Sequence, residues 1–323
     1  MVFYASHLVD SYIQGRARNL NFTADGNHLV VESMDSVGQT PSIGMIYLLD
    51  VSTLEIATSY STQDDLLYGG FAVDPMGSRI ATFGCGGAVI RDVRSGEPYV
   101  ATERMGFDHA CYSPDGKKLI LSRDGNSLFT LDTLTGSLME GIEHDLLTTS
   151  ICPVADDVYL ITAVDQGGAG MWFFTLDDKG IMRDAPEDFG QVVFPGDSLF
   201  ATFSTYTQKI CAVDNLINIF SYPGAHWQAS FNSRGEFVYP EEHVEPRWCE
   251  GYWSNPVFLG ESGILAVKSP HGLLFLDLNS NQLLDIQEEQ SLRMMLAYHD
   301  GNKLLASVGS DGKCIVRQIS ITR

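Results

Sequence analysis

The stretch Ala110-Cys-Tyr-Ser-Pro-Asp-Gly-Lys-Lys-Leu-Ile-Leu-Ser122 carries the pattern that decides the fold of this chain. Two short apolar runs flank a turn at Asp115 and Gly116. Asp and Gly both make tight turns accessible, and apolar residues at every second position are typical of a half-buried strand. The stretch therefore predicts a β-hairpin.

The same pattern recurs along the whole chain, which indicates an internal repeat. The turns of the successive hairpins are spaced by 49, 41, 41, 41, 37, 27 and 39 residues. A period of about 40 residues is the length of one four-stranded sheet. The eight turn positions are Asp25, Asp74, Asp115, Asp156, Asp197, Arg234, Glu261 and Asp300.

A second pattern follows most hairpins: an apolar strand that ends in Asp and leads into a polar turn. A hairpin, this third strand and a linking strand give four strands per unit. Such a sheet buries both faces only when it packs between two neighbours around an axis. The instances are Ile46–Thr53, Val89–Gly96, Leu128–Gly136, Phe173–Asp177, Ile210–Asp214, Leu273–Asn279 and, with Gln in place of Asp, Cys314–Gln318.

The predicted fold is therefore all-β, a single β-propeller domain over residues 1–323. The number of four-stranded blades is seven or eight. Eight hairpins favour eight blades, but the 27-residue gap between Arg234 and Glu261 is short for a full unit. Either one of eight blades has lost a strand, or a ring of seven blades carries an extra hairpin.

The stretch Phe107–Leu121 resembles the first half of a WD40 repeat, and Leu305–Arg317 resembles the second half. Over residues 10–320 the chain resembles the WD40-like (WD40/YVTN-type) β-propellers, with degenerate repeats. The Gly-His dipeptide of that family is absent, and only His109 lies near its place. The family's Trp before the strand-ending Asp is replaced by Leu49, Arg91, Leu131, Leu176, Val213 and Leu276.

The resemblance implies a structural role for three polar residues. In WD40 proteins the region of His109 can join a hydrogen-bonded tetrad with the Asp of a tight turn between strands. Asp124 and Asp311 occupy that turn position in this sequence. Buried polar groups would then satisfy one another rather than perform catalysis.

The composition is acidic and rich enough in apolar residues for a sizeable core. Lys and Arg number 20, Asp and Glu number 41, and the formal charge is −21. A hydrophobic fraction of 44% excludes a disordered chain. Direct nucleic-acid binding is not expected, because it requires a basic face. The charge instead favours a basic protein or peptide as partner, although Asp at repeated turns accounts for part of it.

The sequence favours a soluble, intracellular protein, located in the cytoplasm. The first residues contain neither a basic segment nor an apolar stretch of signal-peptide length. No window approaches 18 consecutive apolar residues, so membrane insertion is not expected. No CxxC pair exists, and the cysteines are interpreted as reduced core residues: Cys85, Cys111, Cys152, Cys211, Cys249 and Cys314.

Residues 239–255 are the least repeat-like part of the chain and form either an irregular insertion or an incomplete blade. Trp, Tyr and Arg are enriched at binding hot spots. One interpretation is an interaction loop; the alternative is that Trp248 and Trp253 fill the core where the blade is irregular. The candidate interaction residues are His243, Arg247, Trp248, Tyr252 and Trp253.

No pattern of catalytic, metal-binding or cofactor-binding residues stands out. HExxH, Walker A, the Rossmann fingerprint and G-x-S-x-G are all absent. We therefore expect no cofactor and no catalytic residue. The leading hypothesis is a non-enzymatic interaction scaffold or adaptor, including a subunit of a larger complex. The alternative is a propeller enzyme or small-molecule binder of the lactonase or hydrolase type, with carboxylates at the central channel.

Overall fold

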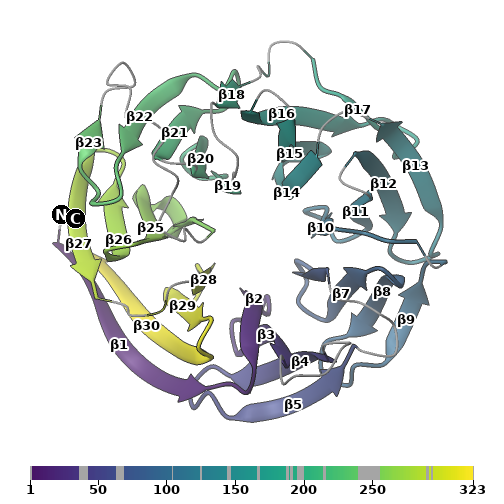
Figure 1. Cartoon of the computed structure of the whole chain (residues 1–323), viewed down its shortest axis with the longest axis horizontal. Coiled ribbons are helices and arrows are strands. Elements are labelled where there is room, and N and C mark those ends of the chain that lie inside the picture. Colours follow the sequence, from purple (N-terminus) through teal and green to yellow (C-terminus); the bar gives the residue numbers. More distant parts are fainter. Residues whose placement is uncertain are drawn as a thin grey trace.

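The computed structural model describes residues 2–35, 43–62, 69–103, 105–123, 126–143, 147–165, 168–186, 189, 192–194, 200–213, 216–238, 255–288, 291 and 294–322. These residues form seven antiparallel sheets that stand as blades around a central axis (Figure 1). The prediction of an all-β, WD40-like propeller is confirmed, and the number of blades is seven.

Blades 1 to 3 follow the predicted repeat most closely, each with four strands ordered from the axis outward. Blade 1 contains β2 (Arg16–Phe22), β3 (His28–Asp35), β4 (Ile43–Asp50) and β5 (Ile56–Ser61). Blade 2 contains β6 (Gly70–Val73), β7 (Arg79–Gly84), β8 (Gly87–Asp92) and β9 (Pro98–Ala101). Blade 3 contains β10 (His109–Tyr112), β11 (Lys118–Arg123), β12 (Ser127–Asp132) and β13 (Leu138–Glu143).

Blades 4 and 5 each have a fifth strand. Blade 4 contains β14 (Leu147–Ala155), β15 (Val158–Asp165) and β16 (Gly168–Leu176), and its outer edge is shared by β17 (Met182–Asp184) and β18 (Val192–Phe194). Blade 5 contains β19 (Phe200–Ser204), β20 (Lys209–Val213), β21 (Ile217–Ser221), β22 (Trp227–Phe231) and β23 (Phe237–Val238).

The two ends of the chain close the ring in blade 7. Blade 6 contains β24 (Val257–Phe258), β25 (Ile264–Ser269), β26 (Gly272–Asp277) and β27 (Gln282–Gln287), with a short 3-10 helix, η3 (Gly260–Ser262), in its first turn. Blade 7 contains β28 (Met294–His299), β29 (Leu304–Gly309) and β30 (Lys313–Thr322), and its outer strand is β1 (Val2–Tyr12). β1 pairs antiparallel with β30 from Val2 opposite Thr322 to Tyr12 opposite Lys313. The sequence patterns did not predict this closure.

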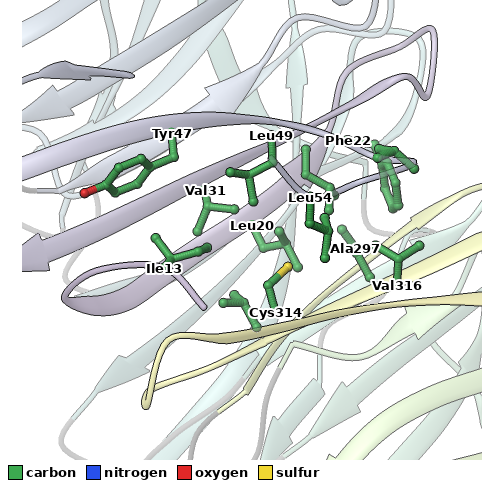
Figure 2. Packing of buried hydrophobic residues seen from close by; sticks show 14 of the residues in the cluster. Ile13, Leu20, Phe22, Val31, Tyr47, Leu49, Leu54, Ala297, Cys314 and Val316 are labelled. Carbon is green, nitrogen blue, oxygen red and sulfur yellow. The ribbon is translucent and has the colours of Figure 1, made fainter. Parts of the chain in front are cut away.

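The core lies in the seams between blades, because alternate residues of each strand face opposite neighbours. In β3, Leu29 and Val31 pack toward blade 7, whereas Val30 packs with Phe71 and Ile80 of blade 2. Figure 2 shows the seam between blades 7 and 1, where Leu20 lies beside Cys314 and Leu49 belongs to the same cluster. Burying one such aliphatic side chain contributes roughly 1.5–3 kcal/mol.

The structure shows that one of the eight predicted hairpins, at Asp197, is wrong, and it decides between the two interpretations of the hairpin at Arg234. The strands on either side of Asp197 belong to different sheets, because β18 pairs with β16 and β19 pairs with β20. The hairpin at Arg234 exists, but it joins β22 to β23 at the outer edge of blade 5. It is the extra hairpin of a seven-bladed ring. Alternating apolar residues indicate a strand without saying which strand it pairs with, and this caused the error at Asp197.

The first turn of blade 5 lies elsewhere than predicted. Residues 205–208 connect β19 to β20. The run from Ile210 is therefore the second strand of this blade, and the third strand is β21. The turn at 205–208 contains no Asp or Gly, so the pattern that found the other first turns could not find it.

Candidate interaction surfaces

The predicted interaction loop lies outside the described residues. Residues 239–254 connect β23 of blade 5 to β24 of blade 6, and none of the five candidate side chains between His243 and Trp253 has a described position. The description resumes at Asn255, whose Nδ2 donates to the Leu296 carbonyl at 2.8 Å. The Leu296 N–H donates back to Asn255 Oδ1 at 3.1 Å. The end of the segment is thereby fixed to β28, while the loop itself stays a prediction.

The three residues of the predicted polar tetrad have local surroundings of different kinds. His109 begins β10 and is half-buried, and burial lowers its pKa against the opposing effects of the Asp108 charge and a hydrogen bond to the Thr148 backbone. Asp311 lies in the tight turn between β29 and β30, where its Oδ1 accepts the Lys313 N–H at 3.1 Å. Asp124 lies outside the described residues. The tetrad stays a prediction.

One face of the ring is built from repeated turns, and we call it the turn face. In an antiparallel blade, the turn after the first strand and the turn after the third strand lie at the same end. In the first turn of blade 3, Asp115 Oδ1 accepts the Lys117 N–H at 3.0 Å and the Ser113 hydroxyl at 2.8 Å. The Lys117 backbone and side chain hold the pKa of Asp115 near 2. This carboxylate is ionised and stabilises the turn through these hydrogen bonds.

The turns after the third strands use the same device. Asp92 Oδ1 accepts the N–H groups of Arg94 at 3.0 Å and Ser95 at 2.7 Å. The Ser95 backbone bond lowers the pKa of Asp92, and burial opposes it only partly. Asp50 and Asp132 cap their own turns in the same way and also have lowered pKa values. Repeated acids of the sequence thus have a structural function on this face.

The first turns of adjacent blades are tied to one another. Arg79 binds the buried Asp74 through Nε at 2.8 Å and donates through Nη2 to the Gly116 carbonyl of blade 3 at 3.2 Å. Between blades 7 and 1, His299 Nε2 lies 3.0 Å from the Ala24 carbonyl. Because a carbonyl only accepts, Nε2 carries the proton in this bond. These bonds fix the turns relative to the ring.

A longer contact crosses from blade 5 to blade 7. The Tyr206 hydroxyl donates to Asp300 Oδ2 at 3.0 Å, and Lys303 Nζ lies 2.7 Å from Asp300 Oδ1. Tyr206 belongs to the first turn of blade 5, which contains no Asp of its own. An acid of another blade thus accepts a hydrogen bond from this turn, in addition to Ser204 Oγ, which accepts the Thr207 N–H at 3.2 Å.

The seven described inner strands contribute no carboxylate to the channel. None of β2, β6, β10, β14, β19, β24 and β28 contains Asp or Glu. Within the described ranges, no group of three or more His, Cys, Asp or Glu is placed to hold a metal ion. The alternative of carboxylates converging on the channel therefore finds no support in these strands.

Two arginines stand where the family's Trp would be and tie the third strand to the second. Arg91 in β8 lies with Nε 3.4 Å from Thr82 Oγ1 and donates through Nη1 to the Gly96 carbonyl at 3.0 Å. Arg317 in β30 donates through Nη1 to Ser307 Oγ at 2.8 Å. Both arginines are buried. Hydrogen bonds to the strand beside them compensate their burial.

Glu32 is a buried acid in the seam between blades 1 and 2. It is 3% exposed, on the face of β3 that also carries Val30. Its side chain makes no hydrogen bond to any described residue. Burial raises its pKa to about 7, although the charge of Arg18 opposes the shift. Nothing in the sequence around Glu32 indicated burial.

The described cysteines are only partly in the core. Cys111, Cys211 and Cys314 are buried and Cys152 is half-buried, which agrees with their interpretation as core residues. Cys85 is exposed in the turn between β7 and β8, which corrects that interpretation. All five are free thiols. Among the described residues, no helix is long and apolar enough to span a bilayer.

Comparisons with known proteins identify the fold alone. No family model matches the chain, and no curated protein matches it. Among solved structures, the chain is similar to the β-propeller domain of Cps50 (Swd1) from Myceliophteria thermophila. The TM-score is 0.73 over 98% of this chain and 100% of that one, at 12% identity. The chain therefore has a WD40-like propeller fold.

Proposed function

We propose that this protein is a non-enzymatic scaffold or adaptor that binds other proteins through the loops and turns of its ring. The turn face is the observation that carries the proposal. Its turns are capped by their own carboxylates and bonded to neighbouring blades, so the surface is pre-organised. A pre-organised surface loses little conformational entropy on binding, which favours recognition by rigid docking.

A basic partner fits the charge of the chain. The carboxylates of Asp50, Asp92 and Asp132 have lowered pKa values and stay ionised at neutral pH. Complementary charges speed association and weaken as salt rises. We also keep the segment around Arg247, Trp248 and Trp253 as a candidate contact, and an intracellular location as part of the proposal.

Affinity purification from the native source, followed by mass spectrometry at low and high salt, tests the function. A specific set of proteins retained at low salt and reduced at high salt is expected. Replacing Arg247, Trp248 and Trp253 by Ala is expected to weaken that capture with little change in melting temperature. A large fall in melting temperature would instead assign these residues to the core.

Metal analysis of the purified protein tests the enzymatic alternative. A stoichiometric divalent ion would count strongly against a scaffold without chemistry of its own. The central channel, rather than the turn face, would then be the candidate functional site.

A further inference from the structure

The turns of blades 1 and 2 expose large apolar side chains at the turn face. Ile56 is 54% exposed, Met76 is 73% exposed and Tyr99 is 63% exposed. Ile56 and Tyr99 lie at the starts of the outer strands β5 and β9, and Met76 lies in the first turn of blade 2. Exposed apolar side chains grouped on a polar rim mark interaction surfaces more often than single ones do.

Direct contacts join blades 1 and 2 at these turns. Gly77, next to Met76, lies against Ala24 in the first turn of blade 1, with no room for a side chain between them. Gly96 also lies close to the ring of Tyr60 in β5. The Tyr99 hydroxyl lies 3.4 Å from Asp92 Oδ2. The three apolar side chains therefore stand on adjoining, fixed turns.

Five acids lie in the turns of blades 1 and 2, as the apolar residues do, and none is within salt-bridge distance of a described cation, although the charge of Arg91 acts on Glu97 and that of His28 on Asp25 and Asp50. Among the described residues, none of Asp25, Asp50, Glu55, Asp92 and Glu97 forms a salt bridge, and the basic residues of these turns outside the Asp74–Arg79 pair are Arg94 and His28. Other turns differ, because Lys117 neutralises Asp115 and Lys303 neutralises Asp300. We call the surface formed by Ile56, Met76, Tyr99 and these five acids the blade 1–2 patch.

The capping acids of the patch keep one oxygen for a ligand. In Asp25, Asp50 and Asp92 the backbone N–H groups of the turn bind Oδ1. Among the described bonds, Oδ2 of Asp25 and of Asp50 accepts none, whereas Oδ2 of Asp92 accepts the Tyr99 hydroxyl at 3.4 Å. A partner cation can therefore bind Oδ2 without breaking the cap, and a charge-assisted bond is stronger than a neutral one.

We propose that the blade 1–2 patch binds a segment of a partner protein in which Lys or Arg side chains alternate with aliphatic or aromatic ones. The basic side chains bind the carboxylates of the patch, and the apolar ones cover Ile56, Met76 and Tyr99. This inference rests on the interaction function proposed above and names its surface and the chemistry of its partner.

Binding of a synthetic peptide to the full chain tests the proposal. The probe is a fluorescent 12-residue peptide of alternating Lys or Arg and Leu or Phe, followed by fluorescence anisotropy at low and high salt. The triple variant Ile56→Ser, Met76→Ser, Tyr99→Ser is expected to weaken binding at least ~10-fold. The double variant Glu55→Gln, Glu97→Gln is expected to weaken it about 3-fold and to reduce the salt dependence.

Matched controls separate the patch from general stickiness. Leu8→Ser with Leu147→Ser removes comparably exposed apolar side chains elsewhere and is expected to leave binding within about 2-fold. A probe with Ser in place of Leu and Phe is expected to bind far more weakly. Equal binding by the triple variant and the control variant, or by the two probes, overturns the proposal. The proposal is also overturned if the wild type forms a dimer and the triple variant is a monomer, because the patch would then bind a second copy of the chain.

The two proposals fail in different ways. If native partners are captured equally by the wild type and the triple variant, the scaffold function stands and the patch proposal is wrong. If the wild type captures no partner while the probe still binds through the patch, the scaffold function is wrong and the patch remains a site for basic, apolar segments.

Discussion

The turn face and the seam between blades 1 and 2 place carboxylates in opposite surroundings. On the turn face, Asp115 accepts a backbone N–H and a hydroxyl and lies beside Lys117, and its pKa falls to about 2. In the seam, Glu32 is 3% exposed, and burial raises its pKa to about 7. Folding stabilises the charged form of Asp115 and destabilises the charged form of Glu32.

The difference shows that acidity alone says little about what an acid does in this protein. The N–H and hydroxyl groups of such a turn stabilise a charged carboxylate better than water does, since the pKa values of the capping acids are lowered. A seam provides such groups only if neighbouring strands happen to place them there. Asp74 combines both situations, because it is buried but binds the Met76 N–H and the Arg79 guanidinium.

The largest expected effect is the loss of the Asp74 charge. Asp74→Asn leaves the guanidinium of Arg79 half-buried beside a neutral amide, and breaking a buried pair in this way costs about 3 kcal/mol. Chemical unfolding in urea at neutral pH measures it. Asp178→Asn, in the exposed turn after β16, serves as the control. A loss no larger than that of the control would mean that the caps, rather than the ion pair, hold this turn.

The second largest effect is a gain in stability, expected from the loss of the Glu32 charge. Glu32→Gln is expected to stabilise the protein at pH 8, by as much as about 3 kcal/mol, since the pKa of Glu32 is raised from 4.5 to about 7. The stability attached to a raised pKa is fully present below pH 4.5 and is lost as the pH rises through 7. The advantage of the variant should therefore grow between these values and then level off.

The free energies of unfolding of the wild type and of Glu32→Gln, measured from pH 4 to pH 8, test this expectation. Glu55→Gln serves as an exposed control. If the difference in free energy of unfolding between Glu32→Gln and the wild type stays constant with pH, Glu32 is not a buried ionisable group. The gain would then come from packing of the amide instead.

A smaller effect is expected for the cap of blade 3. Asp115→Ala removes one acceptor of a backbone N–H, which costs about 1 kcal/mol. Because the pKa of Asp115 is lowered from 3.8 to about 2, its contribution is present above pH 3.8 and is lost as the pH falls through 2. Thermal unfolding at pH 7 measures the loss. Ser113→Ala should give part of the same loss, and no loss in either variant would contradict the capping role.

The smallest effect is expected at the contact between blades 5 and 7. Tyr206→Phe removes the hydroxyl that donates to Asp300, an exposed bond worth about 0.5 kcal/mol. Hydrogen exchange at the N–H groups of residues 205–208 is the sharper measurement, because this turn has no carboxylate cap of its own. Unchanged exchange in this turn would show that its strands alone hold it.

The turns that cap themselves were predictable from sequence, and those held by other blades were not. The conformation of the turn Ser113-Pro-Asp-Gly116 can be predicted from its own residues. The capping carboxylate, the hydroxyl that it binds and the glycine lie within four residues. The first turn of blade 5 combines a local bond, from the Thr207 N–H to Ser204 Oγ, with a bond to Asp300, 94 residues away from Tyr206 in the chain. The candidate site divides in the same way. The sequence singled out residues 239–255 by their composition, whereas the adjoining turns of blades 1 and 2 gather Ile56, Met76 and Tyr99 only in the folded ring.

By itself the sequence determined the strand-and-turn unit, its period and the propeller architecture, because hairpins with Asp and Gly turns are local and repeat about every 40 residues. Only the tertiary structure decided the number of blades, the closure by β1 and the burial of Glu32. Strand pairing between distant segments depends on which edges remain open once the other blades have packed. The direction that a side chain faces depends on that pairing, since a shift of one residue reverses every side chain of a strand.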